Sequence, residues 1–441
     1  MTQINATHDP ALRSWITSAN ELGTDFPIQN LPFGVFQRLG AKDGPCCGVA
    51  IGDYVVDVSA ISDLFQDAAL SAAKACAASN LNPLLAIGLD AVSDLRAQLS
   101  RILAERNSTA RDQVTEALVP RAGVDMSLPI RTAGYTDFFA SVHHATNAGR
   151  LFRPDQPLLP NYKHVPIAYN GRANSIQVSG APVTRPRGQI QVDGAHPTFC
   201  PTSRLDHEVE LGMVVGPSSF KGQPVTVAGA WSHIFGFTLL NDWSARDIQS
   251  WEYQPLGPFL AKSFATSISP WIVTAEALAP FRVEPESRMP GDPKPLPHLW
   301  DEADQRRGAL HIQIDAHLSS EKMRGQGLPS VQLSRSNAAT LYWTFAQMVA
   351  HHTSNGSAID SADVLGSGTI SGPTADALGS LLEITAGGRN HLTLPSGEER
   401  RFLEDGDEVC LTGFCERPGF IRIGFGECRA LVKPARSQTH Q

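Results

Sequence analysis

Apolar and polar residues alternate along the chain with two different periods, which predict two kinds of secondary structure. Residues 47–58, C-G-V-A-I-G-D-Y-V-V-D-V, contain two apolar runs around Gly52-Asp53, a pattern typical of a β-hairpin. In residues 90–104 apolar side chains recur every three or four positions, which predicts an amphipathic helix. A second helix is expected over roughly residues 109–118. From residue 130 onward, short strands and turns predominate.

The segment R-L-D-H-E-V-E-L-G-M-V-V, residues 204–215, has the composition of a buried strand but carries regularly spaced acids. Asp206, Glu208 and Glu210 occupy alternate positions in it. Side chains of a strand alternate between its faces, so Glu208 and Glu210 are expected to point the same way. Two ionised carboxylates placed side by side on a half-buried face repel each other and lose hydration. Either a solvated strand face or a bound cation would explain them.

Two further acids favour the cation. Asp137 lies among aromatic residues in Y-T-D-F-F, and Asp242 ends an apolar strand in L-L-N-D-W-S. Carboxylates are rarely buried without a partner. Four acids in three apolar segments therefore predict an all-oxygen site for one hard divalent cation, Ca²⁺, Mg²⁺ or Mn²⁺.

The composition indicates a globular protein and limits its partners. Of the 441 residues, 42% are hydrophobic, and 36 Lys and Arg against 44 Asp and Glu give a net charge of −8. Neither a nucleic acid nor a membrane is an expected partner of such a chain. The long apolar run 225–242 is interrupted by Ser232 and His233, which predicts core strands rather than a membrane span.

The cysteines and the N-terminal residues bear on location. Seven cysteines are scattered without a C-x-x-C pair, which predicts thiols in a reducing compartment rather than a disulfide framework or a zinc ribbon. The first residues show no secretory signal, so we expect a cytoplasmic protein.

The chain is long enough for two domains. Residues 118–129, L-V-P-R-A-G-V-D-M-S-L-P, have prolines near both ends and are the best candidate for a linker. We therefore expect a small mixed N-terminal domain over 1–128 and a larger, mainly β domain over 129–441. Residues 279–301 contain many prolines and predict a long surface loop.

Several polar side chains stand in contexts that suit catalysis. His144, in V-H-H-A-T-N, is a candidate general base, although any one of 14 histidines can equally be structural. Arg246, Gln249 and Tyr253 are spaced three and four apart, so on a helix they share one face. Such a face is either an ordinary amphipathic turn or a set of donors for an anionic ligand.

Two other segments are open to two interpretations. Lys262 lies in the apolar run F-L-A-K-S-F-A-T, where it either extends to solvent or pairs with acids. The segment G-S-G-T-I-S-G-P, residues 366–373, is glycine-rich but lacks a nucleotide-binding spacing. Its glycines are expected to let backbone N–H groups approach a carboxylate or a carbonyl.

Longer strings of the sequence resemble the fumarylacetoacetate hydrolase (fumarylacetoacetase) family. The matching strings include Y-T-D-F, H-A-T-N, L-L-P-N-Y, G-R-A-N-S-I, N-D-W-S-A-R-D-I-Q, P-L-G-P-F-L-A-K-S-F and S-G-T-I-S-G-P. The resemblance extends from about residue 25 to residue 428 and does not depend on any single short motif.

The resemblance implies a fold, an assembly and a reaction. The fold would be mainly β (α+β), with a small SH3-like N-terminal barrel followed by a larger C-terminal β-roll, assembled as a homodimer. The reaction would be hydrolysis of a carbon–carbon bond in a 1,3-diketo acid, giving fumarate and acetoacetate, the last step of tyrosine and phenylalanine breakdown.

The resemblance also implies roles for individual residues. Ca²⁺ or Mg²⁺ would be held by Asp137, Glu208, Glu210 and Asp242, with a second ion near Asp242, Lys262 and Thr266. His144 would be the general base, oriented by Glu383, while Arg246, Gln249 and Lys262 would stabilise negative charge. The substrate would contact Phe139, Arg153, Tyr169, Gln249, Tyr253 and Thr369.

The chain departs from the family pattern near the expected substrate. Phe139 stands where the family usually has a tyrosine, and Ala261 and Ala265 stand where it usually has glycine. A related hydrolase or decarboxylase of diketo acids such as acylpyruvates therefore remains an alternative. A non-catalytic Ca²⁺-binding β-domain is a second alternative, from a different class of protein.

Overall fold

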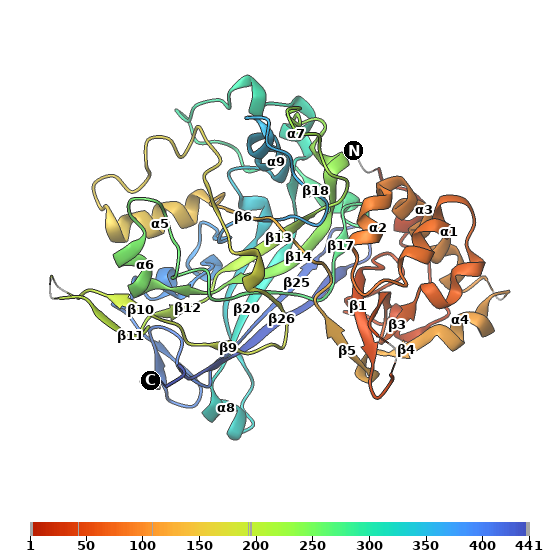
Figure 1. Cartoon of the computed structure of the whole chain (residues 1–441), viewed down its shortest axis with the longest axis horizontal. Coiled ribbons are helices and arrows are strands. Elements are labelled where there is room, and N and C mark those ends of the chain that lie inside the picture. The colour runs from red at the N-terminus through yellow and green to blue at the C-terminus, as the bar shows by residue number, and fades with distance from the viewer. Residues whose placement is uncertain (1–2, 43, 108, 193, 195, 438–441) are drawn as a thin grey trace.

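A computed structural model describes residues 3–42, 44–107, 109–192, 194 and 196–437 of the chain. The chain forms a strand-rich α+β protein, in which a small N-terminal unit lies beside a larger unit built around long strands (Figure 1). The predicted fold class is therefore confirmed, whereas the predicted domain boundary at residues 128 and 129 stays a prediction. None of the helices in the described residues is long and apolar enough to cross a membrane.

The N-terminal unit is a five-stranded antiparallel sheet covered by helices. The sheet has the order β4-β3-β2-β1-β5, with β1 Phe33–Arg38, β2 Cys46–Ile51, β3 Tyr54–Asp57, β4 Leu118–Pro120 and β5 Val124–Ser127. Its helices are α1 Asp67–Ala75, α2 Asn82–Ile87, α3 Leu89–Leu103 and α4 Arg111–Ala117. Strands β2 and β3 form the predicted hairpin, and α3 and α4 are the two predicted helices. The apolar face of α3, including Leu95 and Leu99, is fully buried.

The predicted linker is wrong. Residues 118–120 and 124–127 form β4 and β5, the two edge strands of the N-terminal sheet. Pro120 lies at the end of an edge strand, where its missing N–H costs no hydrogen bond within the sheet. The prolines that suggested a linker are therefore compatible with strands.

The larger unit contains two main sheets. The first has the order β7-β6-β22-β13-β14-β16-β8, with β17 also paired to β14. Its strands are β6 Tyr135–Phe138, β7 Ala168–Asn170, β8 Ile176–Val178, β13 Val209–Val215, β14 Ile234–Asp242, β16 Thr266–Ile268, β17 Val273–Thr274 and β22 Val364–Gly366. The second has the order β21-β20-β25-β26-β9, with β9 Val183–Thr184, β20 Gln313–Ser319, β21 Val331–Asn337, β25 Glu408–Cys415 and β26 Ile423–Lys433.

Smaller elements complete this unit. The short strand pairs are β10 Arg187–Ile190 with β11 Thr198–Pro201, β12 Leu205–Asp206 with β15 Ser244–Ala245, β18 Arg282–Val283 with β19 Ala309–Leu310, and β23 Leu392–Thr393 with β24 Glu399–Arg400. The helices are α5 Val142–Phe152, α6 Arg246–Glu252, α7 Glu302–Arg307, α8 Glu321–Gly325, α9 Phe345–Thr353 and α10 Leu381–Ile384. Its short 3₁₀ helices span Ala173–Ser175, Ala230–His233, Ala279–Phe281, Pro297–Leu299, Ala338–Thr340 and Ala375–Ala377. Those in the N-terminal part of the chain span Ala6–His8, Thr17–Asn20, Ser59–Leu64 and Arg121–Gly123.

Three expectations about single segments are refined. The strand predicted over 204–215 is interrupted at His207 and Glu208, which separate β12 from β13. The apolar run 225–242 forms a 3₁₀ turn and one strand, β14. The proline-rich segment 279–301 is mostly without regular structure, but its first residues are buried.

None of the seven cysteines forms a disulfide in the described residues, as their spacing predicted.

The two units share one apolar core. The backbone of Phe33 in β1 exchanges two hydrogen bonds with Ile272, at 3.0 and 2.8 Å. Val214 and Leu240, from the first main sheet, pack in the same buried cluster as the helices of the N-terminal unit. The N-terminal unit therefore covers one face of the sheet that carries the site described below.

A glycine at this junction generates a prediction. A Cβ atom on Gly34 would lie 2.7 Å from the ring of Trp271 and 2.9 Å from the carbonyl oxygen of Pro270. Because overpacking a rigid junction is costly, Gly34→Ala should lower the free energy of unfolding by about 1–3 kcal/mol. Gly123→Ala is the matched control, since nothing lies within 4 Å of its Cβ position. Denaturant titration measures both, and equal stabilities would contradict the expected packing.

Candidate metal centre and active site

Three buried carboxylates meet in the first main sheet. Asp137 lies on β6, Glu210 on β13, and Asp242 at the last position of β14. All three side chains are buried, and one carboxylate oxygen of each lies within 4.8 Å of the others. The structure thus brings together three predicted ligands that are far apart in the sequence.

The close approach of Asp137 and Glu210 depends on glycine in the strand between them. Strand β22 pairs with β13 on one side and with β6 on the other, where Gly366 stands opposite Asp137. A Cβ atom on Gly366 would lie 2.3 Å from Oδ1 of Asp137 and 3.1 Å from Oε2 of Glu210. The backbone N–H of Gly368 donates to Oδ1 of Asp137 at 3.2 Å. The glycine-rich segment therefore approaches a carboxylate through its backbone, as the sequence predicted.

The three acids carry more negative charge than their surroundings compensate. Neither carboxylate oxygen of Glu210 has a hydrogen-bond partner among the described residues. Burial raises the pKa of Glu210 well above its ordinary value, and the charge of Asp137 raises it further. Burial and the charge of Asp242 act in the same direction on the pKa of Asp137. A divalent cation would relieve this repulsion, and an all-oxygen set suits Ca²⁺, Mg²⁺ or Mn²⁺. The residues therefore fit a metal ion.

Glu208 is arranged differently from the other predicted ligands. Its carboxylate forms an ion pair with Lys262, and its Oε1 lies 2.9 Å from Nη2 of Arg246. Burial alone would raise the pKa of Glu208, but Lys262 and then Arg246 lower it below its ordinary value. Glu208 therefore lies beside the three clustered acids as a compensated carboxylate, and its role as a metal ligand stays a prediction.

Lys262 and Arg246 supply the buried positive charge. The Nζ atom of Lys262 donates to Oδ2 of Asp242 at 2.6 Å, so the lysine pairs with acids instead of extending to solvent. Burial alone would lower the pKa of Lys262, but the charges of Asp242 and Glu208 raise it. Arg246 also donates through Nη1 to Oε1 of Gln249 at 3.1 Å, so the two share a helix face as their spacing predicted. Both cations therefore stay charged at neutral pH.

The sequence interpretation missed Asp206, although the alternation of acids included it. Its carboxylate accepts a hydrogen bond from Nε of Arg246 at 2.8 Å. It also accepts the backbone N–H groups of Leu381 at 2.8 Å and Leu382 at 3.0 Å, in the first turn of α10. Asp206 therefore connects Arg246 to the short helix that carries Glu383.

His144 and Glu383 form a buried pair. Nδ1 of His144 lies 2.7 Å from Oε2 of Glu383. Asn147 donates to the other carboxylate oxygen at 3.0 Å, and the hydroxyls of Ser371 and Ser380 donate to Oε2 at 2.8 and 2.9 Å. Burial alone would raise the pKa of Glu383, but His144 and these hydrogen bonds lower it to about 2. An ionised Glu383 holds the proton on Nδ1 and leaves Nε2 to exchange a proton with a ligand.

The three residues that support Glu383 were also missed. Asn147 follows His144 by one helical turn in the string H-A-T-N, so its position was readable as the same helix face. Ser380 caps the N-terminus of α10. Ser371 lies in the glycine-rich segment, and only the tertiary structure brings it to Glu383.

A single cavity of about 1510 Å³ collects most of the predicted site. The predicted residues that line it are Asp137, Phe139, His144, Arg153, Tyr169, Glu208, Glu210, Arg246, Gln249, Tyr253, Lys262 and Thr369. Three predicted residues do not line the cavity: Asp242, Thr266 and Glu383. Asp242 and Glu383 form hydrogen bonds with residues that do line it, Lys262 and His144, and Thr266 forms one with Asp242. The hydroxyl of Tyr169 donates to Oδ2 of Asp242 at 2.7 Å, and that of Thr266 donates to Oδ1 at 3.4 Å.

Phe139 contributes an aromatic wall next to the histidine. Its ring meets the ring of His144 edge-on, with 5.3 Å between the centroids. Its carbonyl oxygen accepts a hydrogen bond of 2.8 Å from the hydroxyl of Tyr162. The ring therefore restricts the imidazole without donating a hydrogen bond to a ligand.

Known proteins resemble the chain over nearly its whole length. Residues 134–433 match the family model described as fumarylacetoacetate (FAA) hydrolase C-terminal, and residues 29–129 match that described as fumarylacetoacetase N-terminal. Fumarylacetoacetase of Oryza sativa subsp. japonica is 44% identical over 433 residues, which cover 96% of this chain and 98% of that protein. The human fumarylacetoacetase is 42% identical over 420 residues, covering 93% and 97%. The solved structure of a fumarylacetoacetate hydrolase from Exiguobacterium antarcticum aligns over 92% of this chain and 100% of its own, with a TM-score of 0.46 and 15% identity.

The strand-rich fold and its buried acids beside a histidine, taken with these relatives, define a hydrolase. At 44% identity over 96% of its length, the chain belongs to the fumarylacetoacetase family. The expectation drawn from the sequence strings is thereby confirmed.

The carboxylates that lack partners lead to a prediction about metal binding. Glu210→Gln removes one negative charge and one ligand oxygen, so we expect the affinity for Mn²⁺ to fall at least about tenfold. Equilibrium dialysis of chelator-treated protein measures it. Asp304→Asn serves as control, because Asp304 is a buried carboxyl outside the cluster. Unchanged affinity in Glu210→Gln would remove it from the ligand set.

The raised pKa values predict the direction of the pH dependence. Asp137 and Glu210 hold protons to a higher pH than ordinary carboxyls when no ion is bound. A metal ion must displace those protons, so its affinity should increase as the pH rises from acidic toward neutral values. Dialysis at several pH values, at constant ionic strength, tests this. An affinity independent of pH would contradict the proton competition.

Proposed function

We propose that the enzyme hydrolyses the carbon–carbon bond of 4-fumarylacetoacetate, giving fumarate and acetoacetate in the last step of tyrosine and phenylalanine breakdown. The identity of 42% to 44% with fumarylacetoacetases over nearly the whole chain supports this substrate. The observation that carries the chemistry is the His144–Glu383 pair, whose imidazole faces the same cavity as the acid cluster. A base beside a buried acid cluster that can hold a cation suits attack of water on a carbonyl group.

His144 moves the proton in this proposal. Water adds to the ketone carbonyl beside the bond to be broken, and Nε2 of His144 accepts the proton that the water loses. The electron pair of the broken bond goes to the carbon next to the second carbonyl, forming the enolate of acetoacetate, which then takes up the proton. The oxygen of the water ends in a carboxylate of fumarate, so one water is consumed. General-base help of this kind contributes about 10²–10⁴-fold.

The positive groups of the cavity have two different tasks. Arg246 and Lys262 are held in place by ion pairs with acids, and both line the cavity together with Gln249. These three side chains are therefore placed to stabilise the negative charge that develops during the reaction. The guanidinium of Arg153 forms no ion pair with a described carboxylate and donates through Nη2 to the carbonyl oxygen of Pro157 at 3.3 Å. We assign Arg153 to a carboxylate of the dianionic substrate. Phe139, Tyr169, Tyr253 and Thr369 line the rest of the cavity and would hold the substrate between them.

The acid cluster would hold Ca²⁺ or Mg²⁺ through Asp137, Glu210 and Asp242, with Glu208 as a fourth ligand once its ion pairs rearrange. Such an ion supplies a Lewis acid that polarises carbonyl oxygens of the substrate. A second ion would use Asp242, Thr266 and the neighbourhood of Lys262, where the hydroxyl and the ammonium already face one carboxylate.

The assembly, the location and the domain division are also proposals. We propose a homodimer and a cytoplasmic enzyme, on the resemblance to the family and on the scattered cysteines of the sequence. We propose that the domains divide between residues 128 and 129, directly after strand β5, which ends at Ser127.

Turnover of fumarylacetoacetate is the direct test of the function. The enol absorbance of fumarylacetoacetate should disappear on addition of the enzyme, and much more slowly with an acylpyruvate of similar size. Removing divalent ions with a chelator should abolish the activity, and Mg²⁺ or Ca²⁺ should restore it. Turnover of the acylpyruvate alone would favour the related diketo-acid hydrolase. Such a change of substrate would fit Phe139, which lacks the hydroxyl that the family usually presents at this position.

Two adjacent histidines offer a matched test of the buried pair. His144 contacts the buried Glu383, whereas His143 contacts Glu286 at 3.1 Å near the surface. Glu383→Gln should lower kcat by about 10²-fold or more, because the amide no longer favours the proton on Nδ1. Mn²⁺ affinity should stay the same. Glu286→Gln should leave kcat unchanged, and equal rates in the two variants would refute the role of Glu383.

A further inference from the structure

A second cavity, of about 560 Å³, adjoins the first. Tyr169, Asn170, Pro258, Phe259 and Lys262 line both cavities and so form the wall between them. The polar centre of this wall is the carboxylate of Asp242, to which the hydroxyl of Tyr169 and the ammonium of Lys262 both donate. Neither the three clustered carboxylates nor the His144–Glu383 pair lines this second cavity.

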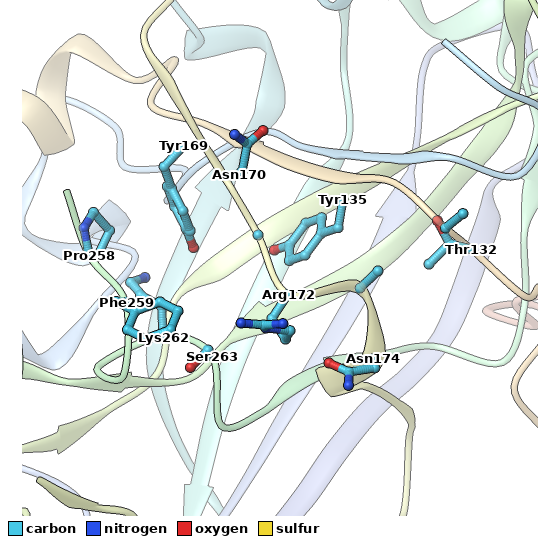
Figure 2. Close-up of a pocket in the computed structure, with 13 residues that line it drawn as sticks. Thr132, Tyr135, Tyr169, Asn170, Arg172, Asn174, Pro258, Phe259, Lys262 and Ser263 are labelled. Atoms are coloured by element: carbon cyan, nitrogen blue, oxygen red, sulfur yellow. The ribbon is translucent and has the colours of Figure 1, made fainter. Parts of the chain in front are cut away.

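The charges that line the second cavity are positive. Two cations, Arg172 and Lys262, line it, and no carboxylate does so among the described residues. Lys262 is already paired with Asp242 and Glu208, whereas Arg172 forms no ion pair with a described carboxylate. Its guanidinium lies 5.8 Å from the ring centroid of Phe259, and Figure 2 shows it among the side chains that line the cavity, below Tyr135. In a chain of net charge −8, this arrangement favours an anion.

The remaining polar groups are hydrogen-bond donors of the kind that an oxygen ligand requires. The hydroxyl of Tyr135 is buried near the side chain of Thr266 but makes no hydrogen bond of normal geometry to any described residue. Figure 2 shows this hydroxyl directed into the cavity, on the side of Tyr169. The side chains of Thr132, Asn170, Asn174 and Ser263 add hydroxyl and amide groups. A planar carboxylate can accept hydrogen bonds from an arginine and from such neutral donors together.

We propose that the second cavity is a binding site for a small carboxylate, with Arg172 as its charged anchor. One of the two carboxylate products of the proposed hydrolysis, either fumarate or acetoacetate, occupies this cavity, so the identity of the ligand rests on the proposed function. Because the Tyr169–Lys262 wall separates the cavities, a product in the second cavity can be bound while substrate occupies the first. Product then inhibits without competing for the substrate site.

Equilibrium dialysis of the intact metal-loaded enzyme with labelled fumarate, and separately with acetoacetate, tests the site at constant ionic strength. We expect two equivalents of one of these carboxylates per chain. Arg172→Gln should lower the affinity for one of the two bound equivalents at least about fivefold. Ala173→Met narrows the cavity without changing its charge and should lower the affinity for the same equivalent. Arg131→Gln is the control, because Arg131 is exposed nearby but does not line the cavity.

Initial rates provide an independent arm. The carboxylate that shows two equivalents should lower the maximal rate at saturating substrate, and Arg172→Gln should raise the concentration required at least about fivefold. One equivalent of each carboxylate in the wild type, or the same binding in Arg172→Gln as in Arg131→Gln, would overturn the second site. Because dialysis needs no turnover, an enzyme that binds two equivalents but does not cleave fumarylacetoacetate would overturn the proposed function and leave the carboxylate site standing.

Discussion

The structure depends on placing three carboxylates within 4.8 Å of one another inside a protein. Such a group is stable only with compensation, because burial and mutual repulsion both disfavour ionisation. Two local features reduce the cost of bringing these carboxylates together. Gly366 removes the side chain that would otherwise separate Asp137 from Glu210, and Lys262 neutralises part of the charge of Asp242. The negative charge of Glu210 remains uncompensated, and this charge is the physical reason for a metal ion.

The same electrostatic constraint extends outward to the catalytic pair. Arg246 is held between Glu208 and Asp206, and Asp206 also accepts the first N–H groups of helix α10. That helix presents Glu383, which holds His144. Within the acid cluster, Asp242 is therefore linked through Lys262 and Glu208 to Arg246, and from there through Asp206 to the helix that carries Glu383.

The sequence allowed the prediction of most groups in this network but not of their connections. Acids in apolar strands and a lysine in an apolar run stand out, because unpaired buried charge is costly. The order β6-β22-β13 places residues 364–366 between two strands that come much earlier in the chain and cannot be read from periodicity, so the role of Gly366 was not predictable. Ser371 precedes Glu383 by only 12 residues, but no periodic pattern indicates that the two side chains meet. Asp206 was visible in the alternation, but its partners lie on α6 and α10. The linker at 118–129 was mistaken because edge strands tolerate proline.

Anomalous diffraction from crystals of the enzyme grown with Mn²⁺ tests the central claim most directly. The account predicts a strong anomalous peak bounded by the carboxylates of Asp137, Glu210 and Asp242, at about 2.1–2.3 Å from their oxygens, whether or not a second peak lies beside Asp242 and Thr266. It also predicts that Lys262 stays beside Asp242. The absence of a peak between these three carboxylates in Mn²⁺-saturated crystals would contradict it, even if a peak appeared elsewhere.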